Sequence, residues 1–312
     1  MQAIYDSIHS AVAGEGTQSS FYTMSHLGLA IQGVDESNAD MYFSVLSNYA
    51  PPLDTVYESG GQMLSDVYGS IVNNAEPTGS ILPPQFNEAK EKYKDASGNN
   101  FPAQAFPPNW WSTQTPFESI SIDSNDLHTD DKSFWTRVDG KTKFDLGIFS
   151  TKADVEGKVH YTKLSTETKN LKLQTEIAGI QVIRSWYDGQ ILSLNDWKVP
   201  GVSRNGYSTG KIESSNKGSF PLLTTKAVLI RNLSIIADWG DEQTKTIDAD
   251  LKASVEFGLG PFKFKGTVDI GPYHKKTYNS TFEHGELKTP KDITYLQGFV
   301  CEIIPACPPK GD

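Results

Sequence analysis

The sequence predicts an α+β fold, in which a helical N-terminal part is followed by an antiparallel β-sandwich or barrel-like domain. Apolar residues recur at helical spacing in the first hundred residues, whereas apolar and polar residues alternate after Phe134, as in half-buried strands. A stretch rich in proline, tryptophan and aspartate separates the two patterns. We therefore expect a helical region at 1–96, a connection at 97–133 and an antiparallel β domain at 134–312.

Apolar stripes and prolines predict the helices. Two stripes have a spacing that places their residues on one helical face: Ile4, Ile8 and Val12, and Met63, Leu64, Val67 and Ile71. Pro83-Pro84 can open a charged helix that ends near Ala96, because proline is tolerated in a first turn. The stripes must be buried against the β domain or another chain, so these helices are expected to serve contacts.

The clearest strand pattern lies at 247–270. Every odd position from Ile247 to Leu259 is apolar and the even positions from Asp248 to Glu256 are polar, and the phase inverts after Gly260-Pro261. This pattern predicts an amphipathic β-hairpin. A slip of the alternation at Gly179-Ile180 indicates a β-bulge in an earlier strand.

The hairpin has two interpretations. In an ordinary core hairpin one face packs on the protein and the other meets water, so Leu251, Val255 and Phe257 would face the core. In a membrane-active hairpin these residues, with Phe262 and Phe264, would face lipid. The first arm exceeds the roughly 9–11 residues that a transmembrane strand needs. We expect the core hairpin and keep membrane insertion as the alternative.

Two tryptophans in the connection, Trp110 and Trp111, are the candidate interaction aromatics. On a loop they could stack on partner side chains or sugar rings. The alternative is that they fill an apolar gap between the domains.

Motifs for catalysis or cofactors are weak. Gly206-Tyr207-Ser208-Thr209-Gly210 matches the nucleophile elbow of α/β-hydrolases, but its flanks predict neither the strand nor the helix that the elbow needs. An acidic cluster could hold a hard cation, yet its spacing favours a solvated loop: Asp123, Asp126, His128, Asp130 and Asp131. We expect no catalytic residue, no metal and no small-molecule cofactor.

Composition narrows the partners and the compartment. The formal net charge of −10 argues against general nucleic-acid binding, which needs a basic surface. The N-terminus has no signal-peptide pattern, so a cytoplasmic protein is expected. Cys301 and Cys307 are interpreted as two reduced thiols, with a local disulfide as the alternative.

Short motifs in the C-terminal half resemble a family of β-rich bacterial and fungal proteins without a settled activity. They are Arg184-Ser185-Trp186, Trp197, Ser208 to Gly210, Pro221, Arg231-Asn232-Leu233, Gly258-Leu259-Gly260-Pro261-Phe262, and Gly298-Phe299 with Pro305. The resemblance covers roughly residues 175–308. It implies a shared fold, with Arg231 and the Gly-Leu-Gly-Pro-Phe turn as structural positions.

The function expected from the sequence is therefore a non-enzymatic interaction or self-assembly protein. Its partner would be another protein or its own copies. A membrane-active, pore-forming-like protein that inserts amphipathic hairpins is the alternative, and only then is a membrane a partner. An enzyme with an unrecognised site is the third hypothesis.

Overall fold

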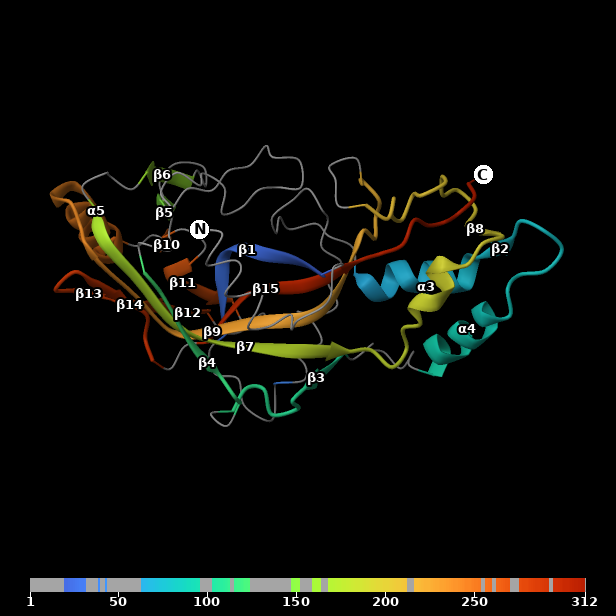
Figure 1. The fold of residues 1–312 in the computed structure, drawn as a ribbon, viewed down its shortest axis with the longest axis horizontal. Helices are drawn as coiled ribbons and strands as arrows, with labels where there is room; N and C mark the ends of the chain where they lie inside the picture. Colours follow the sequence, from blue (N-terminus) through green and yellow to red (C-terminus); the bar gives the residue numbers. More distant parts are fainter. Residues whose placement is uncertain are drawn as a thin grey trace.

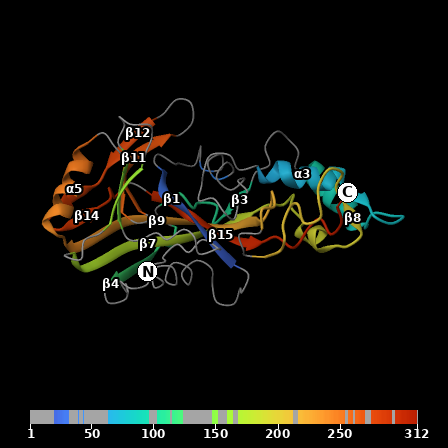
Figure 2. The same ribbon diagram turned by 90° about the horizontal axis from the view of Figure 1, so that it is seen from above.

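The computed structural model describes residues 20–31, 39, 43, 63–95, 103–112, 115–123, 147–151, 159–163, 168–211, 216–253, 256–259, 262–269, 275–291 and 294–311. These residues form a β-rich α+β fold, which confirms the predicted class at that level. The molecule is elongated. Helices α3 (Leu64–Asn74) and α4 (Gln85–Asp95) lie at one end, and α5 (Asp241–Lys252) lies at the other (Figure 1, Figure 2).

The larger sheet extends between these two ends. Its eight strands have the following bounds: β1 (Ser20–Ile31), β3 (Gln104–Phe106), β4 (Glu118–Asp123), β7 (Lys169–Ile183), β9 (Leu222–Asp238), β13 (Thr281–Glu283), β14 (Glu286–Lys288) and β15 (Thr294–Ile303). The long strands β7 and β9 pair with each other. The other edge of β9 pairs with β15 and then with β14, and the other edge of β7 pairs with β4 and β3. The sheet is not closed within the described residues.

A second, five-stranded sheet is also antiparallel throughout. Its strands are β5 (Gly147–Thr151), β6 (Val159–Lys163), β10 (Glu256–Leu259), β11 (Phe262–Asp269) and β12 (Lys275–Asn279), in the order β12-β11-β10-β5-β6. The chain enters this sheet from β9 through α5 and returns to the larger sheet at Ser280, before β13. Helix α5 is therefore one of the connections between the two sheets.

The helical end has its own core. Leu64, Val67 and Ile71 are buried, which confirms three residues of the predicted stripe of α3. Met63 is wrong, because it is the N-cap of the helix and is 43% exposed. The helix ends where Ala75 becomes extended, just before a strand that contains Pro77. Residues of this helical-end cluster come from four regions of the chain: Leu64, Val67, Tyr68, Ile71, Val72, Phe86, Ala89, Trp186, Ile191, Leu192, Trp197, Val199, Tyr207, Phe220, Ile304 and Cys307. Among the described residues, no helix has the length and apolar character needed to cross a membrane.

Polar contacts fasten α4 to the 3-10 helix η1 (Gly189–Ser193). Lys92 Nζ lies 2.7 Å from the Oδ2 atom of Asp188, and Asp188 caps η1 by accepting from the Gln190 amide. The hydrogen bond from Lys92 lowers the pKa of Asp188 below its ordinary value. The Tyr68 hydroxyl donates to the Asp188 carbonyl and accepts from the Asp188 amide, so α3 is fastened to the same turn. Two strands, β2 (Glu76–Pro77) and β8 (Trp197–Lys198), pair nearby.

A β-bulge interrupts the β7–β9 pair. Gln174 lies opposite Ser234, but Glu176 lies opposite Arg231, so β9 contains one extra residue at this point. Asn232, in the bulge, has a φ of 50°, a conformation that asparagine tolerates better than most residues. The slip predicted at Gly179-Ile180 is therefore wrong in position, because Gly179 pairs regularly with Val228.

Side chains around the bulge form a compact polar network. Glu176 accepts from Arg231 Nε at 2.6 Å and from Asn232 Nδ2 at 2.8 Å. The Arg231 guanidinium also lies 3.9 Å from the ring centre of Phe117, which precedes β4. This network joins β4, β7 and β9, and it gives Arg231 a structural position.

The domain boundaries need two corrections. Residues 20–31 form the strand β1, although the sequence predicted helix throughout 1–96. The strand forms because it pairs along β15, a contact between distant segments that no local pattern reveals. Ala39, Phe43, α3 and α4 are helical, and the stripe at Ile4, Ile8 and Val12 lies outside the described residues.

The expected connection at 97–133 also contributes to the sheet. β3 and β4 both pair with β7, so this region is part of the β domain rather than a separate link. The described residues after Phe134 are mostly strands, as predicted, with α5 and η1 as the helical exceptions.

Replacing Glu176 by glutamine should lower the free energy of unfolding at neutral pH by about 1–2 kcal/mol, because a charge-assisted bond is lost. Burial raises the pKa of Glu176, but the hydrogen bonds from Arg231 and Asn232 outweigh it and lower that pKa. The carboxylate therefore stabilises the fold above its unfolded-state pKa, and this contribution is lost as pH falls through the folded-state pKa. Urea unfolding of both proteins at neutral and acidic pH measures the difference.

The matched control is Glu118→Gln, an exposed carboxylate on the neighbouring strand β4. It should change stability by no more than a few tenths of a kcal/mol. Equal losses for the two variants, or a Glu176→Gln effect that persists in acid, would contradict this account of the network.

Candidate functional site

Helix α5 occupies part of the segment that the sequence predicted as the first hairpin arm. Its intrinsic helical tendency is weak, because Thr244, Thr246 and Ile247 are β-branched and lose side-chain freedom in a helix. Its N-cap, Gly240, provides no side-chain hydrogen bond. The helix therefore depends on contacts with the rest of the protein.

The buried face of α5 is partly polar. Ile247 and Leu251, four residues apart, are buried where the helix packs against β10 and β13. Gln243 lies on the buried side as well, at 3% exposure, and its Oε1 atom has no hydrogen-bond partner among the described residues. A buried polar atom without a partner costs about 1–3 kcal/mol. This helix is thus held in place at an energetic cost.

A lysine from the second sheet holds the C-terminal end of α5. Lys265 on β11 is buried, and its Nζ atom donates to the carbonyl of Leu251 at 2.5 Å and to that of Ala253. Asn279 Nδ2 also donates to the Leu251 carbonyl, at 3.3 Å. The last carbonyls of a helix lack partners within the helix and carry partial negative charge, so a cation here is favourable. We call these contacts the Lys265 latch.

A bulge on β11 places Lys265 in this position. Phe257 lies opposite Lys265 but Gly258 lies opposite Lys263, so Phe264 is an extra residue on β11. Phe257 and Phe264 are both buried, with ring centres 6.3 Å apart, and Lys265 is buried beside them. Strict alternation would have put Lys265 on the polar face with Lys263. Sequence reasoning missed the latch, because its only local signal is the weakness of α5.

The predicted first arm from Ile247 to Leu259 is therefore wrong over 247–252, which are helical. It is right for β10, which pairs with β11 as a hairpin. The pattern misled because Ile247 and Leu251 share a face in a helix as well as in a strand. Leu251, Phe257 and Phe264 are buried, as the core interpretation requires. Val255 lies outside the described residues, and Phe262 lies in β11 opposite Leu259.

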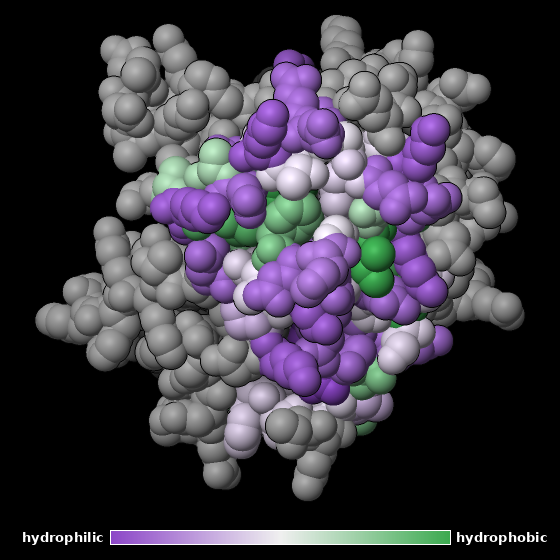
Figure 3. Space-filling model, turned by 90° about the vertical axis from the view of Figure 1, so that its left-hand side faces the viewer, coloured by the Kyte–Doolittle hydropathy of each residue, from purple (hydrophilic) through white to green (hydrophobic). Residues whose placement is uncertain are grey.

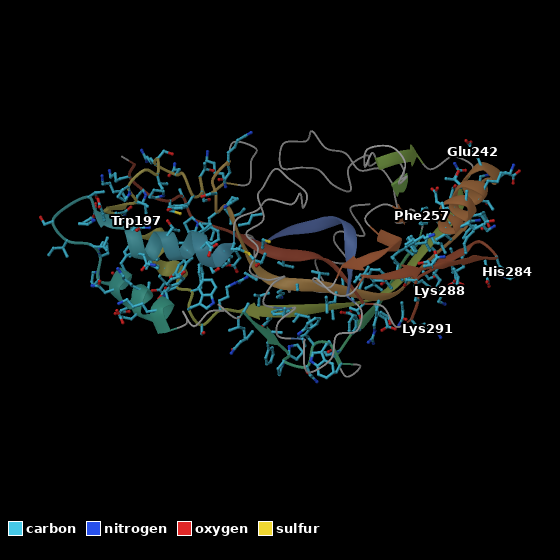
Figure 4. The ribbon with its side chains drawn as sticks, turned by 180° about the vertical axis from the view of Figure 1, so that it is seen from behind. Trp197, Glu242, Phe257, His284, Lys288 and Lys291 are labelled. Atoms are coloured by element: carbon cyan, nitrogen blue, oxygen red, sulfur yellow. The ribbon has the colours of Figure 1, made fainter. Side chains whose placement is uncertain are left out.

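The surface over this segment is mainly hydrophilic. Seen from the end that carries α5, β13 and β14, polar residues surround a smaller hydrophobic area (Figure 3). Figure 4 places Phe257 beside α5 and His284 at the tip of the β13–β14 hairpin, far from Trp197 in the helical end.

The two candidate interaction tryptophans lie in a second core. Trp110 is only 2% exposed, and its ring centre lies 5.6 Å from that of Phe43. Trp111 is partly buried against the same cluster. Trp110 therefore has the gap-filling role rather than a surface role, since its ring is enclosed, while Trp111 keeps a partly accessible side chain.

The outer face beside this core carries two exposed apolar residues. Phe106 on β3 is 56% exposed, and Ile183 at the end of β7 is 43% exposed. β3 pairs Gln104 with Ile183 and Phe106 with Gln181, so these four side chains share one face. We call Gln104, Phe106, Gln181 and Ile183 the β3 corner. The sequence did not single out Phe106, because Phe106-Pro107 indicates a turn rather than a strand.

Ser208 has a structural position. It is fully buried, and its Oγ atom donates to the Ile304 carbonyl at 2.7 Å. The same oxygen lies 3.0 Å from the Gly210 amide and 3.4 Å from Asn216 Nδ2. Ser208 pairs with Cys307 in an isolated bridge, so it does not lie in the strand–turn–helix setting of a nucleophile elbow.

The acidic cluster lies mostly outside the described residues, and the two cysteines lie within them. No group of three metal-ligating side chains is found in the ranges that the structure describes. Of the acidic cluster only Asp123, in β4, is described. Cys301 and Cys307 are both buried and are not joined by a disulfide, and they belong to different apolar clusters. Burial raises the pKa of Cys307 to about 12, which keeps it protonated.

Comparison of the chain with models of protein families, with curated proteins and with solved structures finds no match. Two candidate sites therefore rest on the features of this chain itself. They are the α5–β11 region with its latch and the β3 corner.

Replacing Leu251 by aspartate should destabilise the fold by about 3 kcal/mol or more, because it buries a charge without a partner. Ala249→Asp introduces the same side chain on the exposed face of α5 and should cost less than about 1 kcal/mol. Thermal unfolding of both variants measures the contrast. Similar melting temperatures for the two variants would show that Leu251 does not face the core.

A fluorophosphonate probe should fail to label Ser208, because its hydroxyl is enclosed and donates to a carbonyl. Ser208→Ala should lower the free energy of unfolding by about 1–2 kcal/mol, since the Ile304 carbonyl loses its donor. Mass spectrometry of the treated protein and urea unfolding test the two parts. Labelling that disappears in Ser208→Ala would identify a serine nucleophile instead.

Proposed function

We propose that this protein acts without catalysis, by assembling with another protein chain through the β3 corner. The observation that carries the proposal is the exposure of Phe106 and Ile183 on one face of the β3–β7 pair, at an edge of the larger sheet. In this proposal the two sheets are a sandwich-like scaffold that holds the corner. Large apolar side chains grouped at a surface favour protein contacts over solvent.

The β3 corner is anchored from below. On the opposite face of the same two strands, Ala105 and Ile180 are buried in the cluster that contains Trp110. Because the strand alternates, this anchoring directs Phe106 and Ile183 away from the core. The apolar pair is therefore held on a rigid support, which reduces the conformational entropy lost on binding.

The main chain of β3 offers a second mode of contact. β3 pairs with β7 along one edge, and none of the described strands pairs along its other edge. Such an edge can accept an extended segment of another chain by strand addition. A second copy is the simplest source, since one edge meeting itself gives a closed two-fold dimer. Pro107 limits the pairing to a short segment, because proline lacks an amide hydrogen.

Charge should modulate this association. Each copy carries a formal net charge of −10, so two copies repel each other over distances comparable to the Debye length. Added salt screens this repulsion without weakening apolar contact. Self-association through the β3 corner should therefore strengthen as ionic strength rises.

The double variant Phe106→Ser, Ile183→Ser should weaken self-association by at least about tenfold, because it removes both apolar contacts. Analytical ultracentrifugation across a range of protein concentration and salt measures the dissociation constant. Both side chains are exposed, so the melting temperature of the monomer should stay nearly unchanged.

The matched control is Ile81→Ser. Ile81 is 80% exposed in the loop between β2 and α4, away from the corner. It removes a similar apolar area and should leave association unaffected. Two results would show that the corner is not a self-assembly surface. One is that the double variant and Ile81→Ser weaken association equally. The other is that the wild-type protein stays monomeric at high protein concentration and high salt.

A further inference from the structure

We propose that α5 and β10 are parts of one strand in a second conformation, in which residues 247–259 are fully extended and the 247–270 hairpin enters a lipid bilayer. Three independent features of this segment support the proposal: its sequence pattern, the weakness of α5, and the latch that holds it. The proposal does not depend on the β3 corner.

The sequence of the segment suits a strand better than the helix it forms. In a strand, one face would carry only apolar side chains: Ile247, Ala249, Leu251, Ala253, Val255, Phe257 and Leu259. The other face would carry Asp248, Asp250, Lys252, Ser254 and Glu256. In the helix these two sets mix, so Asp250 is buried and Ala249 is exposed. The extended form separates the two sets completely.

Several features weaken this helix, although acidic residues in its first turn and Lys252 in its last turn favour it. Its N-cap makes no side-chain hydrogen bond, and three of its residues, Thr244, Thr246 and Ile247, are β-branched. It also buries the Oε1 atom of Gln243, which has no hydrogen-bond partner among the described residues. Gln243 and Thr244 precede the alternating segment. Extension would release Gln243 from the buried face and relieve its unmet hydrogen bond.

The latch is the contact that opposes conversion. Lys265 can bond the carbonyls of Leu251 and Ala253 only while these end a helix and the β11 bulge turns Lys265 toward them. Extension of α5 removes this arrangement. Without the bulge, regular alternation returns Lys265 to the polar face with Lys263, where a water-filled interior can hydrate it.

A bilayer is the environment that the extended hairpin fits. Its first arm exceeds the roughly 9–11 residues that span the hydrocarbon region, and its apolar face carries no charge. An isolated hairpin would expose strand edges to lipid, so several copies must close a barrel. In water, the apolar face of the extended hairpin could instead pack against the same hairpin of a second copy. The experiment below separates binding to a bilayer from binding to a second copy.

Ala249→Glu tests the extended state without disturbing the folded one. Ala249 is exposed on α5, so glutamate there should leave the melting temperature and helix content unchanged. In the extended strand the same glutamate would face lipid. Dye release from phosphatidylcholine vesicles should therefore fall by more than about tenfold relative to the wild type, over a range of pH.

The matched control is Lys252→Gln, which changes the net charge by the same amount. Lys252 is exposed in α5 and lies on the polar face of the extended strand, so release should stay at the wild-type rate. A second variant, Lys265→Met, removes the latch. It should raise the strand content measured by infrared spectroscopy on addition of vesicles, and it should speed release severalfold.

The outcomes separate the alternatives. No release by the wild type at any pH, or equal release by Ala249→Glu and the wild type, would overturn the proposal. If Ala249→Glu instead prevents oligomers that form without vesicles, the apolar face meets a second copy in water and the lipid assignment is wrong. If Lys265→Met does not fold, the comparison of Ala249→Glu with Lys252→Gln still decides. These outcomes do not depend on the β3 corner, so loss of self-association in the double variant Phe106→Ser, Ile183→Ser would leave the dye-release results unchanged.

Discussion

The pairing of β7 with β9 is the interaction on which the rest of this structure depends. β7 comes first in the chain and runs to the helical end. β9 then leaves the helical end at Leu222, runs antiparallel to β7 and reaches α5 at the far end. A buried arginine, Arg184, closes the junction by donating to the carbonyl and the hydroxyl of Thr224. Burial lowers the pKa of this guanidinium to about 10, so these hydrogen bonds compensate a charge held away from water. Both ends of the molecule are therefore positioned by one pair of strands.

The bulge at Asn232 decides which neighbour β9 has. Before the bulge β9 pairs with β15, and beyond it with β14. Thr289 lies at the change from β15 to β14. Its amide and its hydroxyl both donate to the Leu233 carbonyl, and its hydroxyl accepts from the Leu233 amide. The extra residue also changes the twist of β9 locally. The change of neighbour along β9 thus coincides with the bulge at Asn232, whose side chain donates to the carboxylate of Glu176.

Sequence patterns predicted those helices and strands whose buried side chains recur regularly within one stretch of the sequence. The stripe from Leu64 to Ile71 and the prolines before α4 were sufficient for two helices, and the hairpin strands β10 and β11 were evident from alternation. β1, β3 and β4 were missed because their pairing partners lie far away in the sequence. At the candidate sites, burial of Leu251 and Phe257 was predictable from alternation. The exposure of Phe106 and the latch on α5 were not, since each depends on a neighbour that only the folded chain supplies.

In the proposal that residues 247–259 can extend, a tertiary contact decides between two local structures. Helix propensities of its residues differ from those of good helix formers by only tenths of a kcal/mol each. A few hydrogen bonds to the terminal carbonyls, together with burial of Ile247 and Leu251, are enough to exceed that sum. In the proposed extended form the same apolar residues would be buried as well, so their burial does not separate the helix from the strand. What the extended form cannot keep is the bond from Lys265 to the end of the helix. The choice of conformation therefore depends on whether that lysine remains buried, and any environment that hydrates it while covering the apolar face favours the strand.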